Sequence, residues 1–332
     1  MLIEPVGTDK SDRPRPLRRR SRSRRALTAS AAGAALVLSG CGNGSGAGGD
    51  DTVSLGFVNG AHTDFHTCLE AAVELAAENA GVKLFTANSQ QNAERELTNI
   101  GQMMTSWKVD ALIIQPVDID ALRDGVARAR AAKVPVFLTS VALEDTSDIL
   151  GAVVVDLEKA GRLDAEWIGK DAQGKRAEVG VVAGAPGAAS DLLVSGFTAA
   201  LPENAQVVAI RPGMFDPAEA RAVGAAMIRE HPGLDYAFVA NEEMALAVRE
   251  AFDVAGAKGV RIVTVNGTAK GLEAIKGGQL SATVTNSPLV NGTMAVRNTL
   301  ALLAGKEVDR IDSVPLVLVT KNNLDQAPQY CT

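Results

Sequence analysis

Two histidines and a phenylalanine stand close together in a polar segment near the start of the folded chain. His62, Phe65 and His66 have side chains that can hydrogen-bond or stack against an organic ligand, and Asp64 adds a carboxylate. Imidazole and carboxylate groups could instead hold a metal ion. Closely spaced ligand-type side chains are common by chance in such a loop, so we favour an organic ligand and predict no metal site. Thr63 belongs to the same predicted ligand-binding group.

The residue sets of common catalytic sites are missing from the sequence. A serine–histidine–aspartate triad would need a histidine outside this segment. The remaining one, His231, stands beside Pro232 at a predicted helix end, where a capping role fits better. The first strand–turn–helix unit lacks G-x-G-x-x-G, and the chain has neither a P-loop nor a G-x-S-x-G motif. We therefore predict no catalytic residues, no enzyme activity and no cofactor.

Strands and helices alternate along the chain and must position these residues. The apolar run 53–58 predicts a buried strand, and the apolar-periodic run that ends at Gly81 predicts a helix that the Thr63 hydroxyl can cap. The other predicted strands are 82–87, 110–115, 135–139, 149–155, 178–183, 206–210, 236–240, 260–265, 282–285 and 316–319; the other predicted helices are 93–107, 119–132, 156–170, 188–201, 217–230, 242–255, 269–276 and 287–303. This alternation predicts an α/β protein of two similar Rossmann-like lobes, in which parallel strands end at ligand-facing elbows.

The first 40 residues have the features of an export signal. An arginine-rich run, 13–25, precedes the apolar run 26–38, which has the length of a signal h-region and is too short for a spanning helix. Leu38-Ser39-Gly40-Cys41 resembles a bacterial lipobox, so we predict a lipoprotein signal peptide, 1–40, and lipidation of Cys41. Segment 41–52 contains the run 42–49, which consists only of Gly, Ser, Asn and Ala, and this composition predicts a flexible tether. We expect an exported protein that is anchored by lipid to the outer face of the cytoplasmic membrane. Export through the Sec pathway and export through the twin-arginine pathway both remain open.

The charge balance argues against nucleic acid as a partner. Nine of the 33 basic residues and three of the 39 acidic residues precede Cys41, which leaves 24 basic and 36 acidic side chains in the remainder. Binding to phosphates needs a basic face, and an acidic chain of this kind lacks the overall charge for one.

Two cysteines remain after the lipobox. Cys68 stands early in the first predicted helix, and Cys331 is the penultimate residue. The spacing excludes a C-x-x-C metal site, and an exported chain with two such cysteines permits one disulfide. We predict that Cys68 and Cys331 pair and hold the C-terminal tail near the first elbow.

Several segments at predicted strand ends form an ordered set. They are the Phe65 elbow, 88–92 (Asn-Ser-Gln-Gln-Asn), 115–118 (Gln-Pro-Val-Asp), 215–216 (Phe-Asp), 241–246 (Asn-Glu-Glu-Met-Ala-Leu), 265–268 (Val-Asn-Gly-Thr) and 278–283 (Gly-Gln-Leu-Ser-Ala-Thr). Over residues 53–320 this set resembles the ribose-binding protein family, the type I periplasmic solute-binding proteins of sugar ABC transporters. The resemblance implies three hinge crossings between lobe 1, 53–155 plus 287–314, and lobe 2, 156–286 plus 315–332. It also implies a ligand cleft that lobe closure buries.

The resemblance carries over residue by residue. Phe65 and Phe215 match stacking aromatics, and Asn241 matches a hydroxyl-binding asparagine. At five places this chain differs from the family pattern. His66 stands where the family has a second aromatic, Ser140-Val141 replaces an Asp-Arg pair, and a residue near Leu193 replaces an arginine. Asn266 replaces an aspartate, and Asn286 replaces a glutamine. Because hydrogen bonds to charged groups are worth about 1.5–3 kcal/mol each, we expect ribose to bind poorly. The predicted pocket suits a neutral deoxy sugar, cyclitol or nucleoside-like compound.

The expected function is the capture of a small neutral solute by a monomeric lipoprotein that delivers it to an ABC permease. A sensor that presents its ligand to a membrane signalling receptor is the alternative, and the two differ only in the partner that recognises the closed lobes. An enzyme on this fold is disfavoured because no nucleophile–base pair is present. A LacI-type repressor would need an N-terminal helix-turn-helix, where this chain has a signal and a lipobox.

Overall fold

A computed structural model describes residues 52–332. The predicted signal peptide, the lipidation of Cys41 and all but the last residue of the tether lie outside the described residues. In the described part, no helix combines the length and the apolar character needed to cross a membrane.

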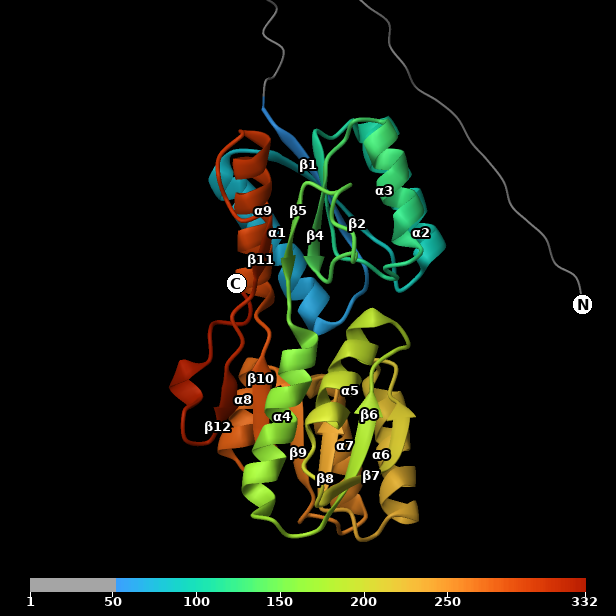
Figure 1. Cartoon of the computed structure of the whole chain (residues 1–332), viewed down its shortest axis with the longest axis vertical. Coiled ribbons are helices and arrows are strands. Elements are labelled where there is room, and N and C mark those ends of the chain that lie inside the picture. Colours follow the sequence, from blue (N-terminus) through green and yellow to red (C-terminus); the bar gives the residue numbers. More distant parts are fainter. Residues whose placement is uncertain (1–51) are drawn as a thin grey trace, which may run out of the picture. The chain divides into compact units, whose positions relative to one another are not determined.

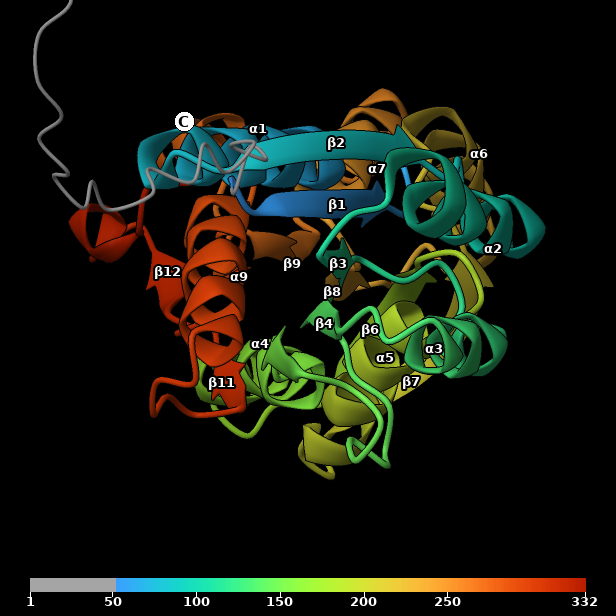
Figure 2. The same ribbon diagram turned by 90° about the horizontal axis from the view of Figure 1, so that it is seen from above.

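The first lobe is built on a sheet of six parallel strands in the order β11-β5-β4-β3-β1-β2. Its strands are β1 (Ser54–Asn59), β2 (Lys83–Asn88), β3 (Ala111–Ile114), β4 (Val136–Ser140), β5 (Gly151–Val154) and β11 (Ile311–Ser313). Its helices are α1 (Asp64–Ala80), α2 (Ala93–Gln102), α3 (Leu122–Ala131) and α9 (Pro288–Leu303). α1 packs against α9 and α2 against α3 on opposite sides of the sheet (Figures 1 and 2).

The second lobe repeats this plan with the strand order β12-β10-β9-β8-β6-β7. Its strands are β6 (Ala177–Ala183), β7 (Ala205–Pro212), β8 (Tyr236–Val239), β9 (Arg261–Asn266), β10 (Ala282–Thr285) and β12 (Leu318–Thr320), of which β12 alone runs antiparallel to its neighbour. Its helices are α4 (Leu157–Ala172), α5 (Ala188–Ala200), α6 (Pro217–Glu230), α7 (Glu242–Val254) and α8 (Ala269–Lys276). β8 is buried throughout and β9 apart from its first residue, as expected for strands covered by helices on both faces.

The chain passes between the two sheets three times. The crossings lie between β5 and α4, between β10 and α9, and between β11 and β12 (Figure 1). The predicted fold class, two similar α/β lobes joined by three crossings, is confirmed. The residue limits that we assigned to each lobe stay a prediction.

Three predictions about single elements were wrong. Strand β11 was missed, because its sequence, Ile-Asp-Ser, is short, polar and largely exposed at the sheet edge. The predicted helix 93–107 is α-helical only as far as Gln102, since its last five residues, Met103–Trp107, form a π-helical turn that directly follows α2. Thr63 is the N-cap residue of α1, but its hydroxyl makes no capping hydrogen bond, because it bonds to the His66 ring instead.

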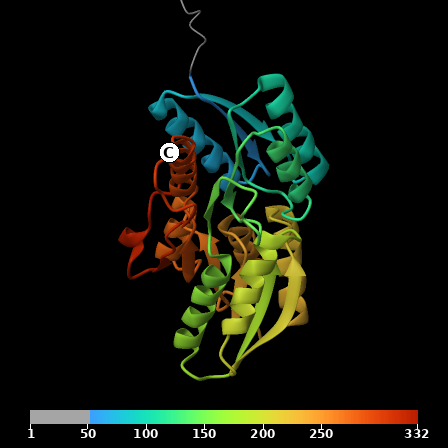
Figure 3. The same cartoon turned by 45° about the horizontal axis from the view of Figure 1, so that its top comes forward.

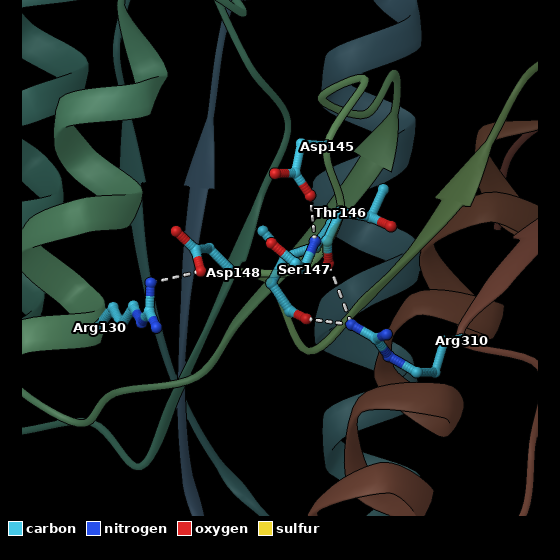
Figure 4. Close-up of polar contacts among 7 residues, drawn as sticks. Arg130, Asp145, Thr146, Ser147, Asp148 and Arg310 are labelled. Atoms are coloured by element: carbon cyan, nitrogen blue, oxygen red, sulfur yellow. Dashed lines mark hydrogen bonds and ion pairs between the residues drawn. The ribbon is translucent and has the colours of Figure 1, made fainter.

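Two arginines hold the loop between β4 and β5 from its two sides (Figure 4). The Arg310 guanidinium donates to the carbonyls of Thr146 (3.0 Å) and Ile149 (2.6 Å), while Arg130 of α3 pairs with Asp148 at 2.5 Å. The Arg310 bonds satisfy loop carbonyls that no strand partner uses, and together with the Arg130–Asp148 ion pair they hold the segment that follows Ser140.

The C-terminal tail returns from the second sheet to the first lobe. Cys331 forms a disulfide with Cys68 of α1, the pair that the sequence predicted, with 5.1 Å between their Cα atoms. Ser287 donates its hydroxyl to the Gln329 carbonyl, and the Tyr330 carbonyl accepts the Leu289 N–H. The C-terminus therefore lies beside α1 and the start of α9 (Figure 3).

Candidate ligand cleft

The carboxyl ends of strands from both sheets border one cleft. Two adjoining cavities of about 150 and about 100 Å³ occupy it. The cavities share six lining residues, which are Thr63, His66, Gln115, Ser140, Ala189 and Phe215. A single water needs only about 10–15 Å³ of such volume, so the cleft has room for a small organic molecule.

The cleft wall of the first lobe is connected by hydrogen bonds to the side chain of Gln115, which follows β3. Its Oε1 accepts the Gly60 N–H at 3.1 Å and lies 3.0 Å from His66 Nε2. Glycine at position 60 permits this contact, because an added Cβ would lie 2.3 Å from Gln115 Oε1 and would displace the amide. The turn after β1 therefore approaches Gln115 through bare backbone.

The protonation of His66 follows from its neighbours. Since Gln115 Oε1 is an acceptor, His66 Nε2 carries the hydrogen, and Nδ1 accepts the Thr63 hydroxyl at 2.8 Å. Burial lowers the pKa of His66 to about 4, although the bond to Gln115 opposes this shift. The imidazole is therefore neutral at physiological pH.

Three asparagines form the wall from the second lobe. Asn241 caps α7 by accepting the Met244 N–H at 2.9 Å, which leaves its NH₂ group directed away from the helix. Asn266 ends β9, and Asn286 follows β10 with its Oδ1 buried and unpaired among the described residues. All three side chains line the smaller cavity.

A buried glutamate holds the loop after Asn266 in place. Glu242 accepts the N–H groups of Gly267 (2.9 Å) and Thr268 (2.7 Å), and burial raises its pKa. Burial, and then the nearby Glu242 carboxylate, raises the pKa of Asp164 on α4 well above its usual range. Glu242 thus fixes the two elbows that carry Asn241 and Asn266.

Two phenyl rings border the cleft. Phe215 lies against Gly184, where an added Cβ would be 2.1 Å from the ring, so glycine permits this approach. Phe65 contacts His66 edge to face, with 5.5 Å between ring centroids. Phe215 lines both cavities, whereas Phe65 lines only the smaller one.

The structure gathers eight of the nine predicted ligand residues around the smaller cavity: Thr63, Phe65, His66, Ser140, Phe215, Asn241, Asn266 and Asn286. His62 lies outside both cavities and is exposed, with its Nδ1 3.4 Å from Asn88 Nδ2, so the structure does not bring it to the cleft. Gln115 and the segment 185–190 were missing from the predicted set. Gln115 had a signal in the sequence, because it stands at a strand end within the 115–118 motif.

The cleft lining is neutral. None of the described residues around either cavity is Asp, Glu, Lys or Arg, and residues 52–332 contain no cluster of three metal-ligating side chains. Amides, hydroxyls, a neutral imidazole and two phenyl rings can hydrogen-bond and stack against an uncharged molecule. They supply neither a charged partner nor an activated nucleophile.

Two lobes around such a cleft define a solute-binding protein without catalytic groups. The family model of the periplasmic binding protein domain matches residues 55–307, and the chain belongs to this family. Its members are non-enzymatic solute-binding proteins of ABC transporters, which confirms the predicted class.

Individual relatives include several sugar-binding proteins. The ribose import binding protein of Bacillus subtilis (strain 168) is 31% identical over 265 residues, which span 80% of this chain and 86% of that protein. The xylitol-binding protein of Mycolicibacterium smegmatis is 25% identical over 288 residues, covering 84% of this chain and 80% of that one. The arabinose-transporter binding protein of Shewanella sp. ANA-3, bound to α and β-L-arabinofuranose, superposes with a TM-score of 0.77 at 27% identity, covering 82% of this chain and 93% of that one.

Proposed function

We propose that this protein captures a neutral sugar-like molecule in the interlobe cleft and delivers it to an ABC permease. The observation that carries the proposal is the cleft lining, in which two phenyl rings and several amides meet and none of the lining residues among 52–332 is charged. C–H faces of a sugar pack on aromatic rings, and its hydroxyls need uncharged hydrogen-bonding partners once they leave water. The sugar-binding relatives support this class of ligand.

The proposed cycle depends on lobe movement. The limits of the moving bodies are 53–155 plus 287–314 and 156–286 plus 315–332, and the three crossings serve as the hinge. Lipidation of Cys41 would keep the protein at the outer face of the membrane as a monomer beside its permease. Replacing Cys41 with serine tests this anchor, because the variant should leave the membrane fraction and lose incorporated labelled fatty acid.

Removal of one stacking ring tests the site. We expect Phe215→Ala to weaken the binding of a sugar found in a thermal-shift screen by about tenfold or more, since the ring's contact area is lost. Trp107→Ala is the matched control, because this aromatic side chain is partly exposed and lines neither cavity. Calorimetry would measure both variants. Equal affinity of Phe215→Ala and wild-type protein would show that the ligand lies elsewhere.

A further inference from the structure

The hydrogen bonds that Gln115 already makes fix the direction of its amide. Oε1 accepts from Gly60 N and from His66 Nε2, so the amide cannot rotate to exchange its oxygen and nitrogen without losing both bonds. Its NH₂ group has no acceptor among the described residues, and Gln115 lines both cavities. Gln115 therefore presents hydrogen-bond donors to a ligand.

The same hydrogen bonds determine whether the Thr63 hydroxyl can donate to a ligand or accept from it. Its hydroxyl hydrogen goes to His66 Nδ1, because the other ring nitrogen gives its hydrogen to Gln115. The Thr63 oxygen, which lines both cavities, retains only lone pairs for a ligand. Thr63 is therefore an acceptor at this wall.

Asn241 repeats the arrangement on the opposite wall. Its Oδ1 accepts the Met244 N–H at 2.9 Å, and a backbone donor cannot reverse its role. Its NH₂ group has no acceptor within the described part of the chain, and the side chain lines the smaller cavity. The two lobes thus face the ligand with amide donors of fixed direction.

Among the three cleft side chains whose hydrogen-bonding direction is fixed, Gln115 and Asn241 are donors and only Thr63 is an acceptor. Each sugar hydroxyl brings a hydrogen that needs an acceptor after burial, and carboxylates are the strongest acceptors in proteins. The described lining residues include no carboxylate, and Ser140 Oγ already accepts the Asn291 NH₂ group at 3.2 Å, so Thr63 and the amide oxygens of Asn266 and Asn286 are the main side-chain acceptors. A ligand oxygen without a hydrogen of its own avoids this shortage.

We propose that the cleft selects neutral ligands that present carbonyl or ether oxygens to Gln115 and Asn241 and a hydroxyl to Thr63, in preference to fully hydroxylated sugars. The inference rests on the proposed function and specifies its ligand chemistry. Lactones of sugars and anhydro sugars have this pattern, since a carbonyl or a ring ether replaces a hydroxyl.

Matched pairs of probes test the preference. Isothermal titration calorimetry would compare D-ribose with D-ribono-1,4-lactone, and D-galactose with D-galactono-1,4-lactone. The lactone of at least one pair should bind wild-type protein about tenfold more tightly than its parent sugar, the effect of one unpaired buried hydrogen-bonding group.

Gln115→Glu replaces the hydrogen-bond donor Nε2 by an oxygen that accepts hydrogen bonds. A glutamate can keep the bonds from Gly60 and His66 with one oxygen, while its second oxygen replaces the NH₂ donor by an acceptor. The ratio of lactone to sugar affinity should fall about tenfold. Gln102→Glu is the charge control, since Gln102 is exposed on α2, lines neither cavity and should leave the ratio unchanged. If Gln115→Glu fails to fold, Asn241→Asp makes the equivalent exchange.

The outcomes separate this inference from the proposed function. Sugars that bind as tightly as their lactones, with a ratio that neither carboxylate variant changes, would overturn the inference and leave sugar capture standing. Failure of folded wild-type protein to bind any neutral sugar or lactone in the screen would overturn both.

Discussion

Three residues of the cleft have positive φ angles, which residues other than glycine rarely adopt. Ser140, Phe215 and Asn266 have φ values of 68°, 53° and 141°. A left-handed conformation costs a non-glycine residue roughly 1–2 kcal/mol, so neighbouring contacts must hold these positions. Asn266 is held through the loop that Glu242 binds, and Phe215 lies against Gly184. At the residue scale, neighbouring contacts hold the backbone positions from which Phe215 and Asn266 reach the cleft.

His66 should make the folded protein less stable in acid. Its pKa of about 4 lies below the usual 6.5, so the unfolded chain binds more protons between these values and stability falls as the pH drops through that range. The full shift corresponds to about 3 kcal/mol. Urea unfolding at pH 7 and pH 4.5 should show a smaller loss for His66→Gln than for wild-type protein, and NMR should place the His66 titration near pH 4. A midpoint near 6.5 would contradict this.

At the element scale, the strands were easier to predict than the details of the elbows. Largely apolar runs identified eleven of the twelve described strands, all but β11, because helices cover both faces of each sheet. The elbows depend on backbone directions and long-range contacts that no local pattern encodes. Gln115 had a visible motif, but its central position became clear only when Gly60 and His66 were placed against it. His62 shares the composition of the elbow, yet the chain turns it outward.

Glu96 links α2 to the segment that borders the cleft. Its carboxylate accepts the Val117 N–H at 2.8 Å, while its other oxygen is buried and unpaired among the described residues. Burial raises the pKa of Glu96 to about 7, and the Asp118 carboxylate adds to the shift. The folded protein therefore binds more protons than the unfolded chain between pH 4.5 and about 7, and Glu96 lowers stability as the pH rises through this window.

Glu96→Gln should remove this loss. We expect the variant to gain up to about 3 kcal/mol relative to wild-type protein between pH 4.5 and pH 7.5, since the glutamine oxygen can still accept the Val117 N–H. Urea unfolding at the two pH values would measure the difference. His66 acts with the opposite sign over a similar range, so the wild-type curve alone hides both effects. Parallel curves for Glu96→Gln and wild-type protein would show that Glu96 does not titrate there.

At the scale of the whole molecule, one contact between the lobes is acidic on both sides. The Asp64 N–H of α1 donates to Glu243 Oε1 of α7 at 3.3 Å, which brings two carboxylates together. Burial, followed by the Asp64 carboxylate, raises the pKa of Glu243, whereas Lys270 lowers it. The contact is therefore favoured when Glu243 is protonated and weakens as the pH rises through its raised pKa.

Ligand-free protein should open as the pH rises. Small-angle scattering should show a larger radius of gyration at pH 8 than at pH 4.5, because the two carboxylates repel each other. Glu243→Gln should reduce this change, since an amide can donate to Asp64 without carrying charge. Glu250→Gln, on an exposed part of α7, is the matched control. A pH response that Glu243→Gln leaves intact would assign it to other groups.

The disulfide between Cys68 and Cys331 closes the polypeptide into a ring that includes nearly all of both lobes. Its ends are 263 residues apart, and the ring contains the three crossings and every strand after β1. A protease that cuts any one loop within this ring would produce two segments that remain one covalent molecule until the bond is reduced. An exported protein meets proteases outside the cell, and for this chain a single cut does not release a lobe.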